Sequence, residues 1–305
     1  MISPLPVTVI GGYLGAGKTS LVNHLLRNAN GLRLAVLVNE FGALPIDEDL
    51  ILAQEGDVIS IAGGCVCCSY GSDMAAALSD LRALEPAPDH VVLEASGVAL
   101  PGAIAGSIGL MQGFSMDGVV ILADAETLRA NADHKYMGDT VTRQLADADI
   151  VVLNKADLVD APTLDASRAF AQSHAVEAQI VTGEHGKVPP EILLQSFVGR
   201  SRDSSMRHDT SGFGSVSVPF DAPCKPAELA QFLASDDLGL VRAKGFVRDG
   251  QGGVHAVQSV SRRWTVEAAP ADSPLGVVCI GLKPSFDAEA VRNAVAAFAD
   301  HAHRL

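Results

Sequence analysis

The sequence predicts an α/β protein in which helices cover both faces of a parallel sheet, followed by a smaller α+β domain. Short β-branched, apolar runs alternate with helical patterns through the first two-thirds of the 305 residues. A polar stretch then interrupts this pattern. Beyond it, the strand candidates alternate between apolar and polar residues, as antiparallel strands do. We therefore expect a first domain over residues 1–198, a linker over 199–213 and a C-terminal domain over 214–305.

The expected strands of the first domain are nearly continuous apolar runs, which is typical of parallel strands buried on both faces. They are Val7–Gly11, Leu34–Val38, Val58–Ile61, Val91–Glu94, Val119–Ala123, Ile150–Leu153 and Gln179–Thr182. Helical patterns fall between most of them, for example over Asp73–Leu84. Such sheets bind ligands at the carboxyl ends of their strands, so motifs at these ends are candidate site residues.

The second domain is predicted to contain a mainly antiparallel sheet and two helices. Its expected strands are Ser215–Phe220, Leu238–Val247, Val254–Val260, Arg263–Ala268 and Gly276–Leu282. A short helix begins at Pro226, and a final helix has Asp287 as its N-cap. Phe286 and Val291 are spaced to form a hydrophobic staple at the start of that helix.

Composition excludes several classes of partner. The formal charge of −14 opposes binding to nucleic acid and to anionic lipid. The uncharged segment Ala95–Phe114 contains Pro101 and several glycines, so we expect a loop and a loosely packed helix rather than a membrane span. No basic stretch followed by an apolar stretch opens the chain, and we expect a cytoplasmic protein.

A phosphate-binding loop follows the first expected strand. The run from Gly12 to Thr19 fits the pattern G-x-x-x-x-G-K-[ST] and is followed by helical spacing. Glycines allow backbone N–H groups to face phosphate oxygens, a lysine adds positive charge, and the hydroxyl of a threonine can bind Mg²⁺. The sequence therefore predicts the parallel sheet of a P-loop NTPase. The expected contacts are Gly12, Gly15, Ala16, Gly17, Lys18, Thr19 and Ser20.

A carboxylate ends the expected strand Val91–Glu94, and Ala95-Ser96-Gly97 follows it. Beside a phosphate loop, Glu94 is placed to bind Mg²⁺ directly or through water. Gly97 has the conformational freedom to bring its N–H close to a γ-phosphate. The alternative is that Glu94 only caps its strand.

A second nucleotide motif, Asn154-Lys155-Ala156-Asp157, ends the strand Ile150–Leu153. Guanine presents its N1–H and its exocyclic amine side by side, and one carboxylate can accept both hydrogen bonds. We therefore expect Asp157 to read the base, Asn154 to bond the base edge or hold neighbouring loops, and the Lys155 stem to lie along the ring. Together with the phosphate loop, this motif predicts GTP as the nucleotide.

Three of the five cysteines form a cluster, Cys65, Cys67 and Cys68. Thiolates select soft or borderline ions such as Zn²⁺ and Cu(I), and metal binding itself promotes their deprotonation. Three thiols are one short of a closed tetrahedral zinc site, which leaves a position for a carboxylate, a histidine, water or a second chain. The alternative is a redox pair that forms a disulfide.

Taken together, these motifs resemble those of the CobW-like GTPases, metal-binding members of the dimer-forming branch of P-loop GTPases. The resemblance rests on the phosphate loop and on Asn39–Gly42, Gly64–Cys68, Glu94–Gly97, Asn154–Asp157 and Arg242–Gly245. It implies a GTP-hydrolysing metallochaperone that binds Zn²⁺ or Co²⁺ through Cys67 and Cys68 with Glu40. It also implies delivery of the metal to a client metalloenzyme or a cobalamin-pathway protein, and a possible homodimer.

Catalysis is expected from Lys18, Thr19 and Glu94, with slow turnover, because the sequence offers no evident catalytic base or arginine finger. Two other functions remain open from the residues. One is a redox-gated regulatory GTPase whose cysteines form a reversible disulfide. The other is an ATP-dependent kinase with structural cysteines.

Overall fold

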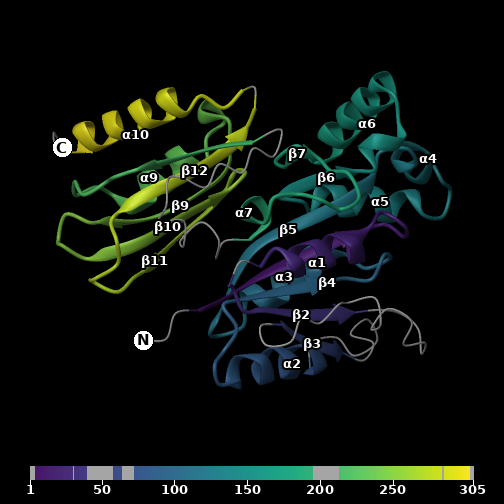
Figure 1. The fold of residues 1–305 in the computed structure, drawn as a ribbon, viewed down its shortest axis with the longest axis horizontal. Coiled ribbons are helices and arrows are strands. Elements are labelled where there is room, and N and C mark those ends of the chain that lie inside the picture. The colour runs from purple at the N-terminus through teal and green to yellow at the C-terminus, as the bar shows by residue number, and fades with distance from the viewer. Residues whose placement is uncertain are drawn as a thin grey trace. The chain divides into compact units, whose positions relative to one another are not determined.

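The computed structural model describes residues 4–29, 31–39, 58–63, 72–194, 213–283 and 285–302. The chain divides into two compact units, Met1–Ser196 and Phe197–Leu305, and each is described here by itself (Figure 1). The predicted linker over residues 199–213 lies outside the described residues except for Phe213, which opens a strand.

The first unit is built around a seven-stranded parallel sheet in the order β3-β2-β4-β1-β5-β6-β7. Its strands are β1 (Leu5–Gly12), β2 (Leu34–Asn39), β3 (Val58–Gly63), β4 (His90–Glu94), β5 (Phe114–Asp124), β6 (Ile150–Asn154) and β7 (Gln179–Thr182). Its helices are α1 (Lys18–Arg27), α2 (Ser72–Ala83), α3 (Pro101–Gly109), α4 (Leu128–Ala132), α5 (Gly138–Ala146), α6 (Ala161–His174) and α7 (Pro190–Leu193). All seven strands occur where the apolar runs predict them.

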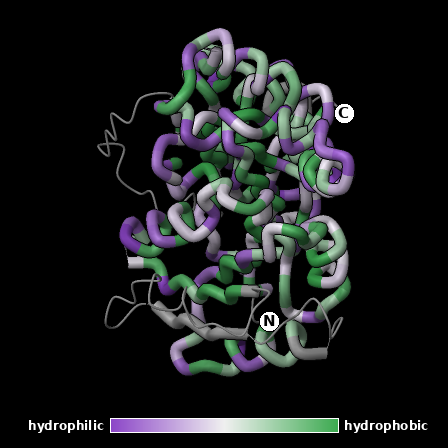
Figure 2. The backbone as a smooth tube through the Cα atoms, turned by 90° about the vertical axis from the view of Figure 1, so that its right-hand side faces the viewer, coloured by the Kyte–Doolittle hydropathy of each residue, from purple (hydrophilic) through white to green (hydrophobic). Residues whose placement is uncertain are grey.

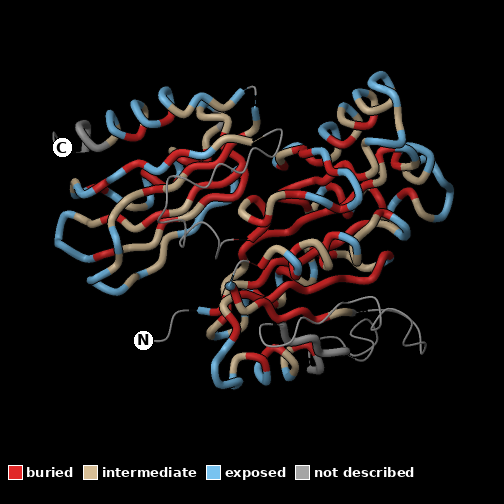
Figure 3. The backbone as a smooth tube through the Cα atoms, viewed as in Figure 1, coloured by how far each residue is buried: buried red, intermediate tan, exposed pale blue. Residues whose placement is uncertain are grey.

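Alternate residues of the central strands face two separate layers of helices. Val7 and Val9 of β1 belong to one core cluster, which also contains buried residues of α2, α3, α5 and α6. Leu21 and Leu25 of α1 are buried outside that cluster, and α1 packs on β1 and β4. Helices therefore cover both faces of the sheet, as predicted, and the apolar, buried strands form the middle layer (Figures 2 and 3).

Strand β5 begins five residues earlier than its apolar run, at Phe114 instead of Val119. The extension contains Asp117. An acidic residue breaks the apolar run from which the strand was predicted, so the sequence placed the start of the strand too late. In the structure, Asp117 is buried and its Oδ2 accepts a hydrogen bond of 2.9 Å from the Thr8 hydroxyl. His90 Nε2 lies 2.9 Å from the same hydroxyl, so this acidic side chain is accommodated by partners on β1 and β4.

The second unit contains a five-stranded antiparallel sheet in the order β11-β10-β9-β12-β8. Its strands are β8 (Phe213–Val218), β9 (Leu240–Arg248), β10 (Val254–Val260), β11 (Arg263–Ala268) and β12 (Gly276–Leu282). Helices α9 (Pro226–Leu233) and α10 (Ala288–Ala302) complete it. Both contribute to one core cluster, through Leu229 and Leu233 of α9 and Val291 and Val295 of α10. This is the predicted α+β arrangement.

Helix α10 begins where its capping residue predicts. Asp287 Oδ1 accepts hydrogen bonds from the backbone N–H groups of Glu289 (2.9 Å) and Ala290 (3.1 Å). Phe286 packs against the core cluster that contains Val291, in agreement with the predicted staple.

The segment Ala95–Phe114 forms a loop and helix α3, as predicted, and its last residue opens β5. Within the described ranges, no helix has the length and apolar character that a membrane crossing requires.

Cys224 and Cys279, the two described cysteines, belong to the core of the second unit. Burial raises the pKa of the Cys224 thiol to about 11, with Asp249 and Glu228 contributing. Burial alone raises the pKa of Cys279 to about 12. Neither is a thiolate at neutral pH, so neither is suited to bind metal or to act as a redox thiol.

We therefore predict that Cys224 and Cys279 resist alkylation in the native protein. At pH 8, about one Cys224 thiol in a thousand is ionised, and both side chains are covered. Mass spectrometry after iodoacetamide treatment should detect modification of both only when a denaturant is added. Rapid labelling of either residue in the folded protein would contradict this assignment.

Candidate nucleotide-binding site

The predicted phosphate loop leads from β1 into α1. Gly12, Gly15 and Gly17 have φ angles of 131°, 77° and 100°, which L-residues with side chains rarely adopt. A Cβ on Gly15 would meet nothing within 4 Å, so the loop borders open space there. Helix α1 begins immediately afterwards without a side-chain cap, which leaves its first N–H groups available to an anion.

The basic and hydroxyl residues of the loop lie in the first turn of α1. Lys18 Nζ donates a hydrogen bond of 3.1 Å to the carbonyl of Gly12, so its side chain folds back over the loop. Thr19 Oγ1 donates to Glu94 Oε1 at 3.1 Å. Ser20 is exposed at the next position. The structure therefore brings together Lys18, Thr19 and Glu94, the three residues expected to carry catalysis.

Thr19 and Glu94 also fit the chemistry of a magnesium site. The Glu94 carboxylate ends β4 and is 6% exposed. A carboxylate and a hydroxyl are the oxygen ligands that Mg²⁺ takes from P-loop proteins. With the Thr19 hydrogen directed at Glu94, the hydroxyl lone pairs remain available to a cation.

Gly97 lies directly against the phosphate loop. A Cβ at this position would come within 2.5 Å of Leu14 Cδ2 and 3.0 Å of the Leu14 backbone nitrogen. The next residue, Val98, is 49% exposed, and Leu14 is 59% exposed. Glycine is therefore required for close approach of the two loops, and each loop carries an exposed apolar side chain next to this contact.

Asn154 connects the two nucleotide motifs. Its Nδ2 donates a hydrogen bond of 2.8 Å to the carbonyl of Ala16, and its Oδ1 accepts one of 2.9 Å from the backbone N–H of Gly186. The side chain is almost fully buried. Of the two expected contacts for Asn154, the structure shows the one that holds neighbouring loops.

Lys155 and Asp157 of this motif each have a side-chain partner. Lys155 has a φ of 59°, and its Nζ lies 2.7 Å from Asp124 Oδ2 at the end of β5. The Asp157 side chain is 25% exposed, and its Oδ2 lies 3.5 Å from His185 Nε2. The Asp157 carboxylate, which is predicted to read the base, is thus partly accessible and has the His185 imidazole beside it.

His185 belongs to a tight turn that follows β7. His185 and Gly186 have φ angles of 53° and 71°, and the Lys187 N–H donates to the Glu184 carbonyl at 2.9 Å. Two consecutive positive φ angles indicate a type I′ turn. A Cβ on Gly186 would come within 2.7 Å of the Leu21 backbone nitrogen, so this turn lies against α1.

His24 provides a second link between α1 and the segment after this turn. Its Nε2 lies 3.1 Å from the carbonyl of Val188, and burial lowers the pKa of its imidazole below the usual 6.5. The ring is therefore neutral at neutral pH and donates to Val188 in one tautomer.

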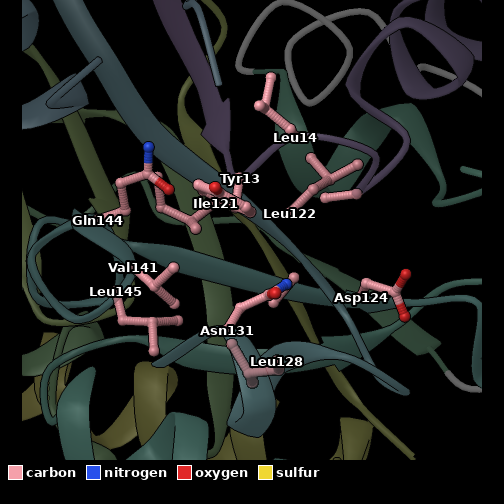
Figure 4. A pocket seen from close by; sticks show the side chains of 12 residues that line it. Tyr13, Leu14, Ile121, Leu122, Asp124, Leu128, Asn131, Val141, Gln144 and Leu145 are labelled. Atoms are coloured by element: carbon pink, nitrogen blue, oxygen red, sulfur yellow. The ribbon is translucent and has the colours of Figure 1, made fainter. Parts of the chain in front are cut away.

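A small pocket borders the phosphate loop (Figure 4). Loop residues Tyr13, Leu14 and Ala16 line it, together with the end of β5 and residues of α4 and α5. Gln144 and Leu145 lie on one side of it, and Asp124 lies on the opposite side. Neither Lys18 nor Thr19 lines this pocket, so we do not place the phosphates in it.

The predicted metal ligands Glu40, Cys65, Cys67 and Cys68 lie outside the described residues. Among the residues that are described, no group of three or more His, Cys, Asp or Glu side chains could hold a metal ion.

The strands that precede these ligands, β2 and β3, are described. Both end at the carboxyl edge of the sheet. Val38 pairs with Glu94, and Asn39 pairs with Gly63. Strands β3, β2 and β4 are neighbours. Gly63 and Glu94 are therefore about two strand spacings apart, roughly 10 Å.

Sequence reasoning missed four residues of this site: Asp124, Gln144, His185 and Gly186. Asp124 ends an apolar strand beside β1, the same signal that indicated Glu94. Gln144 interrupts the buried stripe of Val141 and Leu145 on α5, and a polar residue in such a stripe is a detectable anomaly. Nothing in the sequence indicated which carboxylate His185 approaches.

Comparisons with known proteins agree with this arrangement. Residues 6–182 match the family model "CobW/HypB/UreG, nucleotide-binding domain". Residues 213–299 match "Cobalamin synthesis protein cobW C-terminal domain".

Three curated relatives illustrate the similarity. Zinc chaperone CobW from Sinorhizobium sp is 32% identical over 288 residues, covering 79% of this chain and 81% of the relative. Zinc chaperone YjiA from Escherichia coli K12 is 29% identical over 292 residues, covering 87% and 89%. Zinc-regulated GTPase metalloprotein activator 1 from Schizosaccharomyces pombe is 31% identical over 219 residues, covering 67% and 52%.

The resemblance drawn from the motifs is thereby confirmed, and so is the P-loop fold with its α+β companion. This chain belongs to the CobW/HypB/UreG family of nucleotide-binding proteins and is a GTPase of the CobW type.

Proposed function

We propose that this protein uses Mg²⁺·GTP to hold a transition metal ion, Zn²⁺ or Co²⁺, and to release it to a client metalloprotein or a cobalamin-pathway protein. Two relatives named zinc chaperones and one named a GTPase metalloprotein activator support this class of function. The observation that carries the proposal is the register of β2, β3 and β4. In this register, the last residues of β2 and β3 lie about two strand spacings or less from Glu94. These strands precede Glu40 and the cysteines in the chain.

In this proposal, the loop N–H groups and Lys18 stabilise the charge of the β- and γ-phosphates. Thr19 and Glu94 hold Mg²⁺, which bridges phosphate oxygens and offsets their charge. Gly97, seated against Leu14, presents its N–H toward the γ-phosphate. Asn154 holds the phosphate loop against the turn after β7, and Asp157 accepts both donors of guanine.

The metal ion is the cargo. We propose that Cys65, Cys67, Cys68 and Glu40 provide sulfur and oxygen donors for it, with Cys67, Cys68 and Glu40 as the principal ligands. Hydrolysis removes the γ-phosphate, which loosens segments that this phosphate and Mg²⁺ order. Because β2 and β4 are paired, such a change at Glu94 lies next to the start of the metal-binding segment. A cytoplasmic location and a homodimer are part of the same proposal.

We predict that Asp157→Asn lowers affinity for GTP at least a hundredfold. An asparagine offers one acceptor where guanine presents two donors, and a hydrogen bond to a charged group contributes about 1.5–3 kcal/mol. Xanthine carries a carbonyl in place of the amine, so the variant should bind XTP more tightly than the wild type does. Fluorescent-nucleotide titration measures both affinities. Asp160→Asn, at the exposed N-cap of α6, is the control. Unchanged discrimination between GTP and ATP in the Asp157 variant would contradict the assignment.

We predict that Glu94→Gln raises the Mg²⁺ concentration needed for half-maximal GTP hydrolysis at least tenfold. The amide is nearly isosteric but lacks the charge that attracts the cation. The measurement is phosphate release against Mg²⁺ concentration at saturating GTP. Glu126→Gln, an exposed position just after β5, should behave as the wild type. A Glu94 variant with normal Mg²⁺ dependence would remove this residue from the magnesium site.

We predict that Cys67→Ser abolishes stoichiometric Zn²⁺ or Co²⁺ binding under reducing conditions, because a serine hydroxyl is a poor ligand for these ions. Thiolate-to-cobalt absorption and metal analysis after gel filtration measure the stoichiometry. Cys224→Ala, in the core of the second unit, should retain full binding. If the wild type binds no metal, the metal-delivery proposal is wrong and the redox-gated alternative is favoured.

A further inference from the structure

We propose that Gln144 of α5 is a positioning residue for GTP hydrolysis: it holds the turn Ser96–Ala99 so that the Gly97 N–H faces the γ-phosphate. This inference rests on the proposed role of Gly97. It goes beyond that role by identifying a residue that acts through the backbone of the turn carrying Gly97 and not by contacting the nucleotide itself.

Gln144 uses both hydrogens of its side-chain amide on one loop. Its Nε2 donates to the carbonyl of Gly97 at 3.1 Å and to the carbonyl of Ala99 at 2.8 Å. The residue is 1% exposed, so water does not compete for these donors. These two bonds fix the peptide groups Gly97–Val98 and Ala99–Leu100, so Gln144 holds the part of the turn that directly follows the Gly97 N–H.

The same turn is held at its other end by backbone bonds. The Ala95 N–H donates to Ile10 of β1 at 2.8 Å, which continues the pairing of β4 with β1 past Glu94. The Ala99 N–H donates to the Ser96 carbonyl at 3.0 Å, which closes the turn and fixes the peptide group Ser96–Gly97 that carries the Gly97 N–H. With Leu14 in contact with Gly97, the turn lies between the phosphate loop and α5.

Burial of an amide among apolar neighbours is costly unless its hydrogen bonds are satisfied. Val141 and Leu145 are buried on the same face of α5, so an apolar residue at position 144 would suit packing equally well. A glutamine is useful here because it orients the loop carbonyls. Hydrogen-bond donors that already face the charge developing in the transition state increase the rate of a reaction strongly. A small displacement of such a donor lowers this rate enhancement.

The first test is the kinetics of Gln144→Ala and Gln144→Met in the full chain. We expect kcat for GTP hydrolysis to fall about tenfold to hundredfold, while KM for GTP and affinity for GDP change by about twofold or less. Leu145→Ala is the control, because it destabilises the same helix without removing the amide. Its kcat should stay close to that of the wild type at a temperature where all variants are folded.

The second test is the pH profile of Gln144→Glu, which a purely structural role would not change. A carboxylate at this position faces two carbonyl oxygens, and burial raises the pKa of such a group. Once protonated, its single O–H can donate to one of the two carbonyls. The kcat of this variant relative to wild type should therefore rise as pH falls from about 9 to about 6.

Three outcomes would overturn the inference: a Gln144→Ala enzyme with normal kcat, a Leu145→Ala enzyme with an equal loss, or a flat relative pH profile for Gln144→Glu. These results are separate from a failure of the metal-delivery proposal. The metal-delivery proposal fails if the wild-type protein does not bind a stoichiometric amount of metal, and the Gln144 assays do not measure metal binding.

Discussion

The two hydrogen bonds of Asn154 are the constraint on which the rest of the site depends. One side chain from β6 reaches the phosphate loop at Ala16 and the turn after β7 at Gly186. It also explains a glycine that the phosphate pattern alone attributes to anion binding. A Cβ on Gly17 would come within 2.4 Å of Asn154 Nδ2, so the loop can reach this anchor only if position 17 has no side chain. One buried side chain therefore links the conformation of the phosphate loop to the motif that is predicted to read the base.

Much of the fold could be predicted from the sequence because buried parallel strands are continuous apolar runs, and several of these runs end at a recognisable motif. Strand β5 shows where this reasoning fails. Asp117 interrupts its apolar pattern, and its buried partners Thr8 and His90 come from strands that are distant in sequence. The helix cap at Asp287, by contrast, is a local interaction, and it was predicted to the residue.

The same division applies to the site. Lys18, Thr19 and Glu94 could be predicted because each lies at a fixed offset from a strand end. The pairing of Lys155 with Asp124 and the contacts of Gln144 with the loop after β4 join residues on different elements, and their spacing follows no pattern. Family membership is shown, and the roles assigned to these side chains remain predictions. For the metal ligands, the register of β2 with β3 and β4 gives the starting points of their segments.

The turn at Gly186 has a consequence for nucleotide exchange. This turn packs on the backbone of α1 near Leu21, and His24 links the same helix to Val188. The turn that contains His185, the partner of Asp157, and the helix that bears Lys18 are therefore connected. A displacement of this turn would then be transmitted to the helix that bears Lys18. We expect spent nucleotide to leave as a whole, base and phosphates together, and its dissociation to show a single kinetic phase.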